Sequence, residues 1–294
     1  MGDNGSPENG ANLATGNKKN NSSQTKNEDA DALARQIEES LCITQQAPFH
    51  ILCDLGYGIP KEARPRKEKI LAISKQMVNF LTWQHGDARD GATANQLHHP
   101  AQVEIVSCTD VCAKKAVTER MHELWKAFNG NKTFPTNISF TSSSLEDWVQ
   151  SHASSPSENN LMEKQHGHSF ADVVYLSPDA DKALDLTLPP PRVIVVGLLI
   201  DRRTIQTNKS KDRAHKLDLV AARWPLEQIA SNISSSEPVN VDCVLEGMQQ
   251  WEWNINSSTA ATEKDCRKAG FDAIVQALEH HTERHPERPI HNSE

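Results

Sequence analysis

The sequence has neither a long apolar run nor an apolar leader. No stretch approaches the roughly 18 consecutive apolar residues that a membrane-spanning helix requires. The N-terminal segment carries several acidic residues and no apolar segment, which argues against both a secretory signal and a mitochondrial presequence. We therefore expect a protein of the nucleus, the cytoplasm or both, with no membrane contact.

The chain also lacks any Cys-x-x-Cys pair. Its six cysteines stand at positions 42, 53, 108, 112, 243 and 266. In a nuclear or cytoplasmic protein they are expected to be free thiols, mostly buried as small hydrophobic side chains. Cys108 and Cys112, preceded by His98 and His99, have the residue types of a zinc site. A helix start with two half-buried thiols explains the same spacing better, so we expect no metal.

A surplus of basic residues is missing too. The net charge is −8 and the isoelectric point is about 5.9, whereas neutralisation of phosphates supplies most of the non-specific affinity of RNA-binding proteins. An RNA site on this chain would have to be a local basic patch on an acidic body. Hydrophobic residues make up 37% of the chain and the mean hydropathy is −0.61, so part of the chain is expected to stay outside any core.

Three polar segments account for that low hydropathy. Residues 1–47 are rich in Asn, Gly, Ser, Asp and Lys and are predicted to be a disordered tail with at most a short helix near 31–41. Residues 129–168 are predicted to be a partly ordered polar insertion, in which 137–140 is an alternative strand. Residues 283–294 are predicted to be a flexible tail. The domain itself is expected to span residues 48–282.

Apolar runs alternate with amphipathic segments along this domain. The alternation predicts an α/β fold, a parallel sheet with helices on both faces. Strands are predicted at 49–55, 103–107, 172–176, 193–200 and 219–222. Helices are predicted at 61–83, at 111–128 with Asp110 as its cap, at 179–186, 212–217, 241–251 and 264–281.

Asp201 follows the most apolar of these strands. Ligands bind at the carboxyl ends of strands in open parallel sheets, and Gly197 within the strand marks a close approach of a ligand or another backbone. A carboxylate in this place can accept a proton or hold an amine. The alternative is that Asp201 only caps a turn before Arg202 and Arg203, and these features alone favour that simpler interpretation.

The order of three motifs favours a catalytic role. Residues 173–179 (VVYLSPD), 193–201 (VIVVGLLID) and 221–226 (AARWPL) follow one another at characteristic spacing. They resemble the Tyr-Leu-Thr-x-Asp, Gly-Gly-x-x-Asp and Ala-Arg-Leu-Pro-Ile motifs of the tRNA purine-9 N1-methyltransferase family, which belongs to the SPOUT class. Residues 239–244 (VNVDCV) resemble that family's Leu-Thr-x-Asn-x-Val. The resemblance spans about 48–280, and it is most specific between 172 and 244.

The resemblance implies a SPOUT-type sheet with a C-terminal trefoil knot, an exception to un-knotted topology, in a monomeric enzyme. It implies that three loops hold S-adenosylmethionine, largely through their main chain. The implied cofactor-binding residues are Leu176, Ser177, Gly197, Leu198, Arg202, Arg203, Trp224, Asn240, Val241 and Asp242. Asp201 matches the family's general base.

The implied reaction moves a methyl group to N1 of the purine at position 9 of tRNA. N1 of guanine carries a proton and needs a base, whereas N1 of adenine has a free lone pair, so we expect guanine and leave adenine open. The cluster of basic residues near Asp201 is expected to contact the RNA backbone or, alternatively, to form a solvated helix face. Its members are Arg202, Arg203, Lys209, Lys211 and Arg213.

A second hypothesis is a catalytically degenerate SPOUT-fold protein that binds RNA or acts as a scaffold. Leu198 stands where the family has its second glycine, and Trp224 replaces a leucine. The acidic net charge also favours this second hypothesis. Binding of S-adenosylmethionine would separate the two hypotheses.

Overall fold

The structure is a computed structural model, and it describes residues 49–85, 99–153, 173–198, 208–229, 239–257 and 262–285. The described residues belong to one compact unit. The predicted tail at 1–47, its short helix and most of the predicted C-terminal tail lie outside them, as do residues 154–168 of the predicted insertion. Asp201, Arg202 and Arg203 lie outside them as well.

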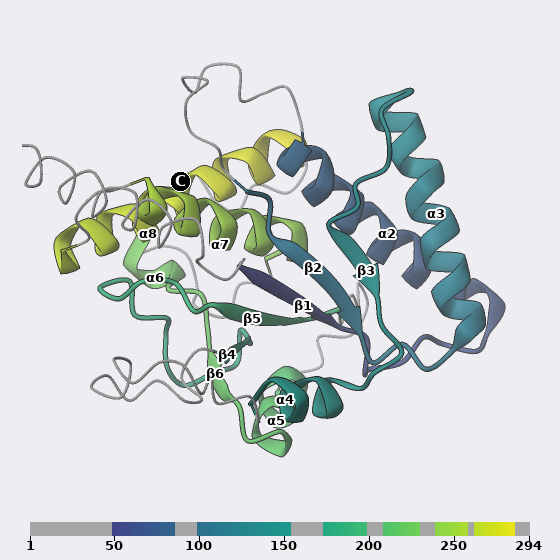
Figure 1. The fold of residues 1–294 in the computed structure, drawn as a ribbon, viewed down its shortest axis with the longest axis horizontal. Coiled ribbons are helices and arrows are strands. Elements are labelled where there is room, and N and C mark those ends of the chain that lie inside the picture. Colours follow the sequence, from purple (N-terminus) through teal and green to yellow (C-terminus); the bar gives the residue numbers. More distant parts are fainter. Residues whose placement is uncertain are drawn as a thin grey trace, which may run out of the picture. The chain divides into compact units, whose positions relative to one another are not determined.

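A six-stranded sheet with the order β3-β2-β1-β5-β4-β6 forms the centre of this unit (Figure 1). Every neighbouring pair of strands is parallel, which confirms the predicted parallel α/β sheet; the knot stays a prediction. The strands are β1 (His50–Asp54), β2 (Gln102–Val106), β3 (Ile138–Phe140), β4 (Val173–Leu176), β5 (Val193–Gly197) and β6 (Val220–Ala222).

Helices cover both faces of the sheet, as predicted. One layer contains α2, α3, α7 and α8, and the opposite face carries α4 and α5 (Figure 1). The helices are α2 (Ala63–His85), α3 (Val111–Asn129), α4 (Leu145–Ala153), α5 (Lys209–Lys216), α6 (Leu226–Ile229), α7 (Val241–Asn256) and α8 (Glu263–Arg284). No helix among the described residues is long and apolar enough to cross a membrane.

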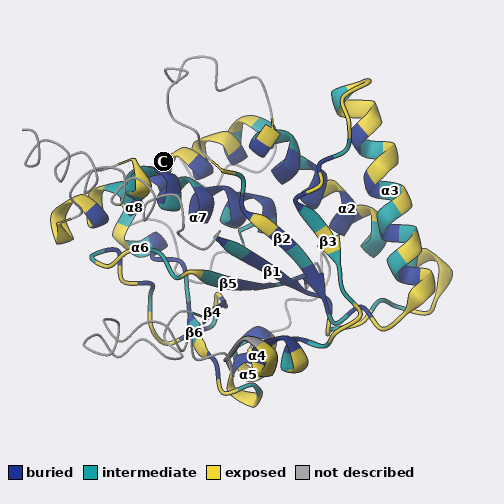
Figure 2. Ribbon diagram, viewed as in Figure 1, coloured by how far each residue is buried: buried dark blue, intermediate teal, exposed yellow. Residues whose placement is uncertain are grey.

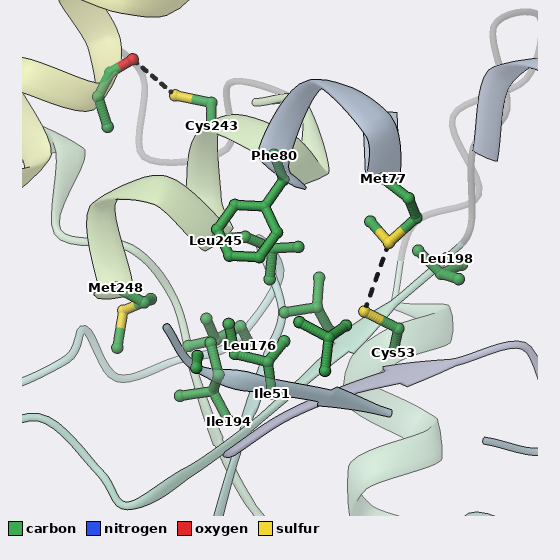
Figure 3. Close-up of a cluster of buried hydrophobic side chains, with 14 of the residues drawn as sticks. Ile51, Cys53, Met77, Phe80, Leu176, Ile194, Leu198, Cys243, Leu245 and Met248 are labelled. Atoms are coloured by element: carbon green, nitrogen blue, oxygen red, sulfur yellow. Dashed lines mark hydrogen bonds between the residues drawn. The ribbon is translucent and has the colours of Figure 1, made fainter. Parts of the chain in front are cut away.

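The two helical layers explain the continuous apolar runs of the central strands. In β1, Ile51 and Cys53 belong to the core under α2 and α7, whereas Leu52 belongs to the core against α4 and α5. In β5, Ile194 and Val195 divide in the same way. Both faces of these strands are therefore buried, as is typical of parallel sheets (Figure 2). Figure 3 shows the larger core, in which Cys53 donates a weak hydrogen bond to Met77.

Two helices differ from the sequence-based expectations. The predicted helix at 179–186 is wrong, because Ala183 forms a parallel bridge to Arg223 and Leu184 donates its main-chain N–H to the Arg223 carbonyl. The Asp185 carboxylate accepts bonds from Thr187, a local pattern that competes with helix formation. Conversely, α4 forms within the predicted polar insertion, and β3 occupies the alternative strand position there.

The α4 helix begins at a reciprocal cap. The Ser144 hydroxyl accepts the Asp147 main-chain N–H at 3.0 Å, and the Asp147 carboxylate accepts the Ser144 N–H at 3.2 Å. A capping box of this kind satisfies two of the free N–H groups at a helix start. Leu145 and Trp148 then bury against the sheet. The Ser-x-x-Asp spacing is the sequence signal that could have indicated this helix.

A carboxyl group on α7 makes the stability of the fold depend on pH. Burial raises the pKa of Glu252 to about 7, although a hydrogen bond from Asn256 lowers it in part. Within the described residues, the second carboxylate oxygen of Glu252 is buried without a hydrogen-bond partner. Because the pKa in the folded chain lies above its ordinary value, ionisation costs folding free energy as pH rises toward and through 7.

We expect Glu252→Gln to be more stable than the natural protein by about 1–3 kcal/mol at pH 8 and nearly equal to it at about pH 4, below the ordinary pKa of a glutamate. Urea unfolding at the two pH values measures the difference. The matched control is Glu279→Gln on α8, where the side chain is exposed. A gain that is the same at both pH values would contradict the explanation.

Candidate active site at the carboxyl edge of the sheet

The order in which successive strands join the sheet changes direction between β1 and β5, although both strands run parallel. The segment after β1 leads through α2 toward β2 and β3, whereas the segment after β5 leads through α5 to β6 on the other side. Asp54 and Gly197, the last residues of β1 and β5, are register partners. In open parallel sheets, ligands bind outside the carboxyl ends of strands at such a reversal. The topology therefore places the candidate site at these two residues.

Asp54 is completely buried at this edge and is surrounded by donors. Its carboxylate accepts the Gly56 main-chain N–H at 2.8 Å, the Tyr175 hydroxyl at 3.1 Å and Arg213 Nε at 2.7 Å. Its main-chain carbonyl accepts the Leu198 N–H at 2.9 Å. A buried carboxylate is stable only when it is paired and hydrogen-bonded in this way. Asp54 thus joins β1 to β4, to the end of β5 and to α5.

Arg213 connects the same edge to the α4 helix. Its two terminal nitrogens bind the Glu146 carboxylate at 2.9 and 3.3 Å while Nε binds Asp54. Burial by itself lowers the pKa of the Arg213 guanidinium, but Asp54 and Glu146 outweigh it and raise the pKa. The side chain is only 16% exposed.

The predicted RNA-binding residues of α5 therefore differ in their surroundings. The guanidinium of Arg213 is engaged by two carboxylates within the protein. Lys211 pairs with Asp181 at 2.7 Å, and Lys209 is exposed. Of the three, Lys209 is the most accessible to a phosphate group, and its contact with RNA stays a prediction.

The chain has two tyrosines, and both belong to this edge. The hydroxyl of Tyr57, in the segment between β1 and α2, lies 2.7 Å from the hydroxyl of Tyr175 on β4. Burial, followed by the charge of Asp54, raises the pKa of Tyr175. Burial also raises the pKa of Tyr57 to about 12, against a lowering by its bond to Tyr175. Both phenols are therefore neutral at physiological pH.

Gly197 is the point at which Tyr57 approaches the sheet. A Cβ atom placed on Gly197 would lie 2.9 Å from Tyr57 Cε2 and 3.2 Å from the hydroxyl of Tyr175. Real Cβ atoms essentially never approach another atom to less than 3.0 Å, so the contact with Tyr57 Cε2 excludes a Cβ unless the ring moves. Glycine is thus required here because an aromatic ring occupies the space, a close approach of the kind that glycine within a strand indicates.

Leu176 and Ser177 bring the end of β4 to the same edge. The Leu176 side chain is buried in the core, and the Ser177 N–H bonds to the Ala222 carbonyl at 2.9 Å. The Ser177 hydroxyl lies 2.7 Å from the hydroxyl of Ser210 on α5. The sequence-predicted Ser177, Leu176 and Gly197 are therefore on adjacent strand ends.

Leu198, predicted as a cofactor contact, has a completely buried side chain. It belongs to the core cluster that contains Cys53 and Met77 (Figure 3). Its side chain therefore lies in the apolar layer under α2. The substitution of a glycine by leucine in the motif has a packing explanation.

Trp224 is also a packing residue. Its indole is 6% exposed, donates to Met248 Sδ at 3.5 Å and lies against Gly247 on α7. Any contact between Trp224 and a ligand at the surface would have to use its main chain. The structure thus places the side chains of Leu198 and Trp224 in the core.

Asn240, Val241 and Asp242 form the start of α7 and contact α2. Gln76 Oε1 accepts the Val241 N–H at 3.0 Å, and Asn79 donates to the buried carboxylate of Asp242 at 2.9 Å. The side chain of Asp242 is therefore held by α2. Their role in holding a cofactor stays a prediction.

Asp54, Tyr57, Glu146 and Tyr175 were not among the predicted site residues. The sequence interpretation gave Asp54 no role, because one acidic residue at the end of a strand is unremarkable. The available signal was an aspartate after a buried strand, followed by glycines at 56 and 58. That spacing indicates a tight turn over a strand end.

No family model and no curated protein matches the chain. Among solved structures, it is similar to full-length spTrm10 in complex with SAH, at 15% identity and a TM-score of 0.47, over 78% of this chain and 95% of that one. It is similar to spTrm10(74) at 15% identity and a TM-score of 0.47, over 77% and 95%. A dual-specific Trm10 from Thermococcus kodakaraensis is similar at 12% identity and a TM-score of 0.43, over 77% of this chain and 99% of that one.

Proposed function

We propose that the protein is an S-adenosylmethionine-dependent methyltransferase that modifies N1 of the purine at position 9 of tRNA, with guanine favoured over adenine. The observation that carries the proposal is the meeting of separate sequence motifs at one edge of the sheet. The motif with Ser177 ends β4, and the motif with Gly197 ends the neighbouring strand β5. This is the edge at which parallel sheets bind ligands.

The residues at this edge suit a nucleoside cofactor. Gly56 and Gly58 are exposed, and a Cβ atom on Gly58 would meet nothing within 4 Å. We infer that main-chain groups around Ser177 and Gly197, with the segment after Leu198, hold the cofactor; Trp224 contributes its main chain, and the start of α7 completes the set. S-adenosylmethionine, when bound, supplies the electrophilic methyl group.

A basic segment supports RNA as the substrate. Residues 61–69 contain five basic and two acidic side chains on a chain whose net charge is −8. Lys61, Arg64 and Lys67 are exposed near the start of α2, which follows β1 at the carboxyl edge. Lys209 is exposed on α5. Such a local concentration of cations suits contact with phosphates.

We assign the general base to Asp201, which follows β5 in the sequence. N1 of guanine must lose its proton as the methyl group arrives, so a carboxylate within reach accelerates the reaction. The target purine must also leave its stack to reach the edge of the protein. Alignment of the two reactants supplies the remaining rate enhancement.

The test is incubation of the full chain with labelled S-adenosylmethionine and total tRNA, followed by mapping of the modified nucleotide. We expect a methyl group on N1 of the purine at position 9. Asp201→Asn is expected to lower the rate on guanine about a hundredfold or more, with a smaller loss on adenine. The matched control is Asp212→Asn, an exposed acidic residue on α5, which should keep full activity.

Two results would contradict the proposal. Full activity of Asp201→Asn on guanine would show that Asp201 is not the general base. Calorimetry that detects no binding of S-adenosylmethionine would show that the protein is not a methyltransferase that uses this cofactor. The second result together with retained tRNA binding would favour the scaffold hypothesis. The two substitutions that favoured the scaffold hypothesis, Leu198 and Trp224, are explained by the burial of their side chains in the core.

A further inference from the structure

We propose that Tyr57 is a stacking surface for a purine ring at the carboxyl edge of β1 and β5. The inference rests on the proposed function, in which the cofactor and the target nucleotide each carry a purine ring. Tyr57 is partly exposed and stands between two exposed glycines, Gly56 and Gly58. Gly58 has φ of +71° and open space where a side chain would be. The two residues next to Tyr57 in the sequence therefore have no side chains that could cover its ring.

The ring of Tyr57 is fixed before any ligand arrives. Because Tyr175 donates its proton to Asp54, its oxygen is free to accept the proton of Tyr57. Cε2 and the hydroxyl of Tyr57 lie against Gly197, and Asp54 is itself held by Arg213. A side chain fixed in this way loses little conformational entropy when a ligand packs on it.

The chemistry of this surface favours a nucleobase. A neutral phenol offers no charge to a phosphate or a carboxylate, whereas nucleobases of every type stack on aromatic rings. Tyr57 also lies at the reversal of strand order, where parallel sheets bind ligands. The purine has two possible sources, the adenine of the cofactor and the target base of the RNA.

The composition of the chain provides a direct probe. Tyr57 and Tyr175 are its two tyrosines, so labelling the full chain with 3-fluorotyrosine gives fluorine NMR signals from this pair alone. Tyr57→Phe identifies the Tyr57 signal by its disappearance. We expect that signal to shift on addition of S-adenosylhomocysteine if the cofactor's adenine stacks there. A shift only on addition of unmodified tRNA identifies the target base instead.

Affinity measurements give a second readout. Tyr57→Phe keeps the ring and should retain affinity for the purine ligand within about twofold, whereas Tyr57→Leu should lose roughly five- to hundredfold. The matched control is Phe128→Leu, a half-exposed aromatic residue on α3, which should change neither affinity. Circular dichroism melting verifies that each variant is folded.

The outcomes separate this inference from the proposed function. If calorimetry shows that both ligands bind while the Tyr57 signal stays in place and Tyr57→Leu keeps its affinity, the stacking inference is wrong and the proposed function stands. If neither ligand binds the folded natural chain, the proposed function and the stacking inference are both overturned.

Discussion

Replacing Asp54 with asparagine is expected to lower the free energy of unfolding by about 3–5 kcal/mol, the loss typical of breaking one side of a buried ion pair. Asparagine can still accept the Gly56 N–H, but it removes the charge that Arg213 Nε contacts at 2.7 Å. Its amide group would also place a second donor near Arg213 and the Tyr175 hydroxyl. The guanidinium would then be left with Glu146 as its counter-charge.

Glu146→Gln is the matched control, because it removes the other carboxylate from the same guanidinium. The Glu146 side chain is 34% exposed, whereas that of Asp54 is completely buried. We therefore expect the control to lose about 1 kcal/mol or less. Urea denaturation followed by tryptophan fluorescence gives both values. Equal losses in the two variants would show that burial of Asp54 does not set the strength of the pair.

Alanine in place of Gly247 is expected to destabilise the protein by about 1–3 kcal/mol. In a typical helix interior, the same change adds up to about 1 kcal/mol of stability. Here a Cβ atom on Gly247 would lie 2.5 Å from Trp224 Cζ2 and 2.7 Å from Cη2. Both atoms belong to a rigid indole that is 6% exposed, so neither can move without disturbing the core.

A double-mutant cycle tests this explanation. Trp224→Leu alone is expected to destabilise the protein because it removes packing. In the Trp224→Leu background, Gly247→Ala should cost little stability or add some, so the effects of the two changes should be strongly non-additive. Gln250→Ala, a partly exposed position on the same helix, controls for effects of helix propensity. Additive losses for Gly247→Ala and Trp224→Leu would mean that the clash is absent.

The parallel sheet could be predicted because its signal is local. Residues 193–197 form a continuous apolar run that needs cover on both faces, and Asp110 caps α3 through the Ala113 N–H. The predicted helix at 179–186 failed because the pairing of Ala183 with Arg223 competes with it. That pairing joins residues far apart in the chain, which local periodicity does not reveal.

The site was less predictable for the same reason. Asp54 meets Arg213 across 159 positions and Tyr175 across 121 positions of sequence. No composition or spacing rule connects such residues before the strands are placed beside each other. Ser177 and Gly197 were predicted together from the motif order, and the structure places them at the ends of adjacent strands; their role at the site stays a prediction. The burial of Leu198 and Trp224 became visible only in the packed core.

Asp54 also has a consequence for changes in the sequence that follows β5. Its carbonyl holds Leu198 and its carboxylate holds Arg213, so one residue anchors the chain on both sides of positions 199–207. The entropic cost of closing a loop grows only slowly with its length. Leu198 and Arg213 are thus held to the end of β1 by the same residue. Insertions in the sequence between these two anchor points should therefore lower the melting temperature less than a change at Asp54 itself.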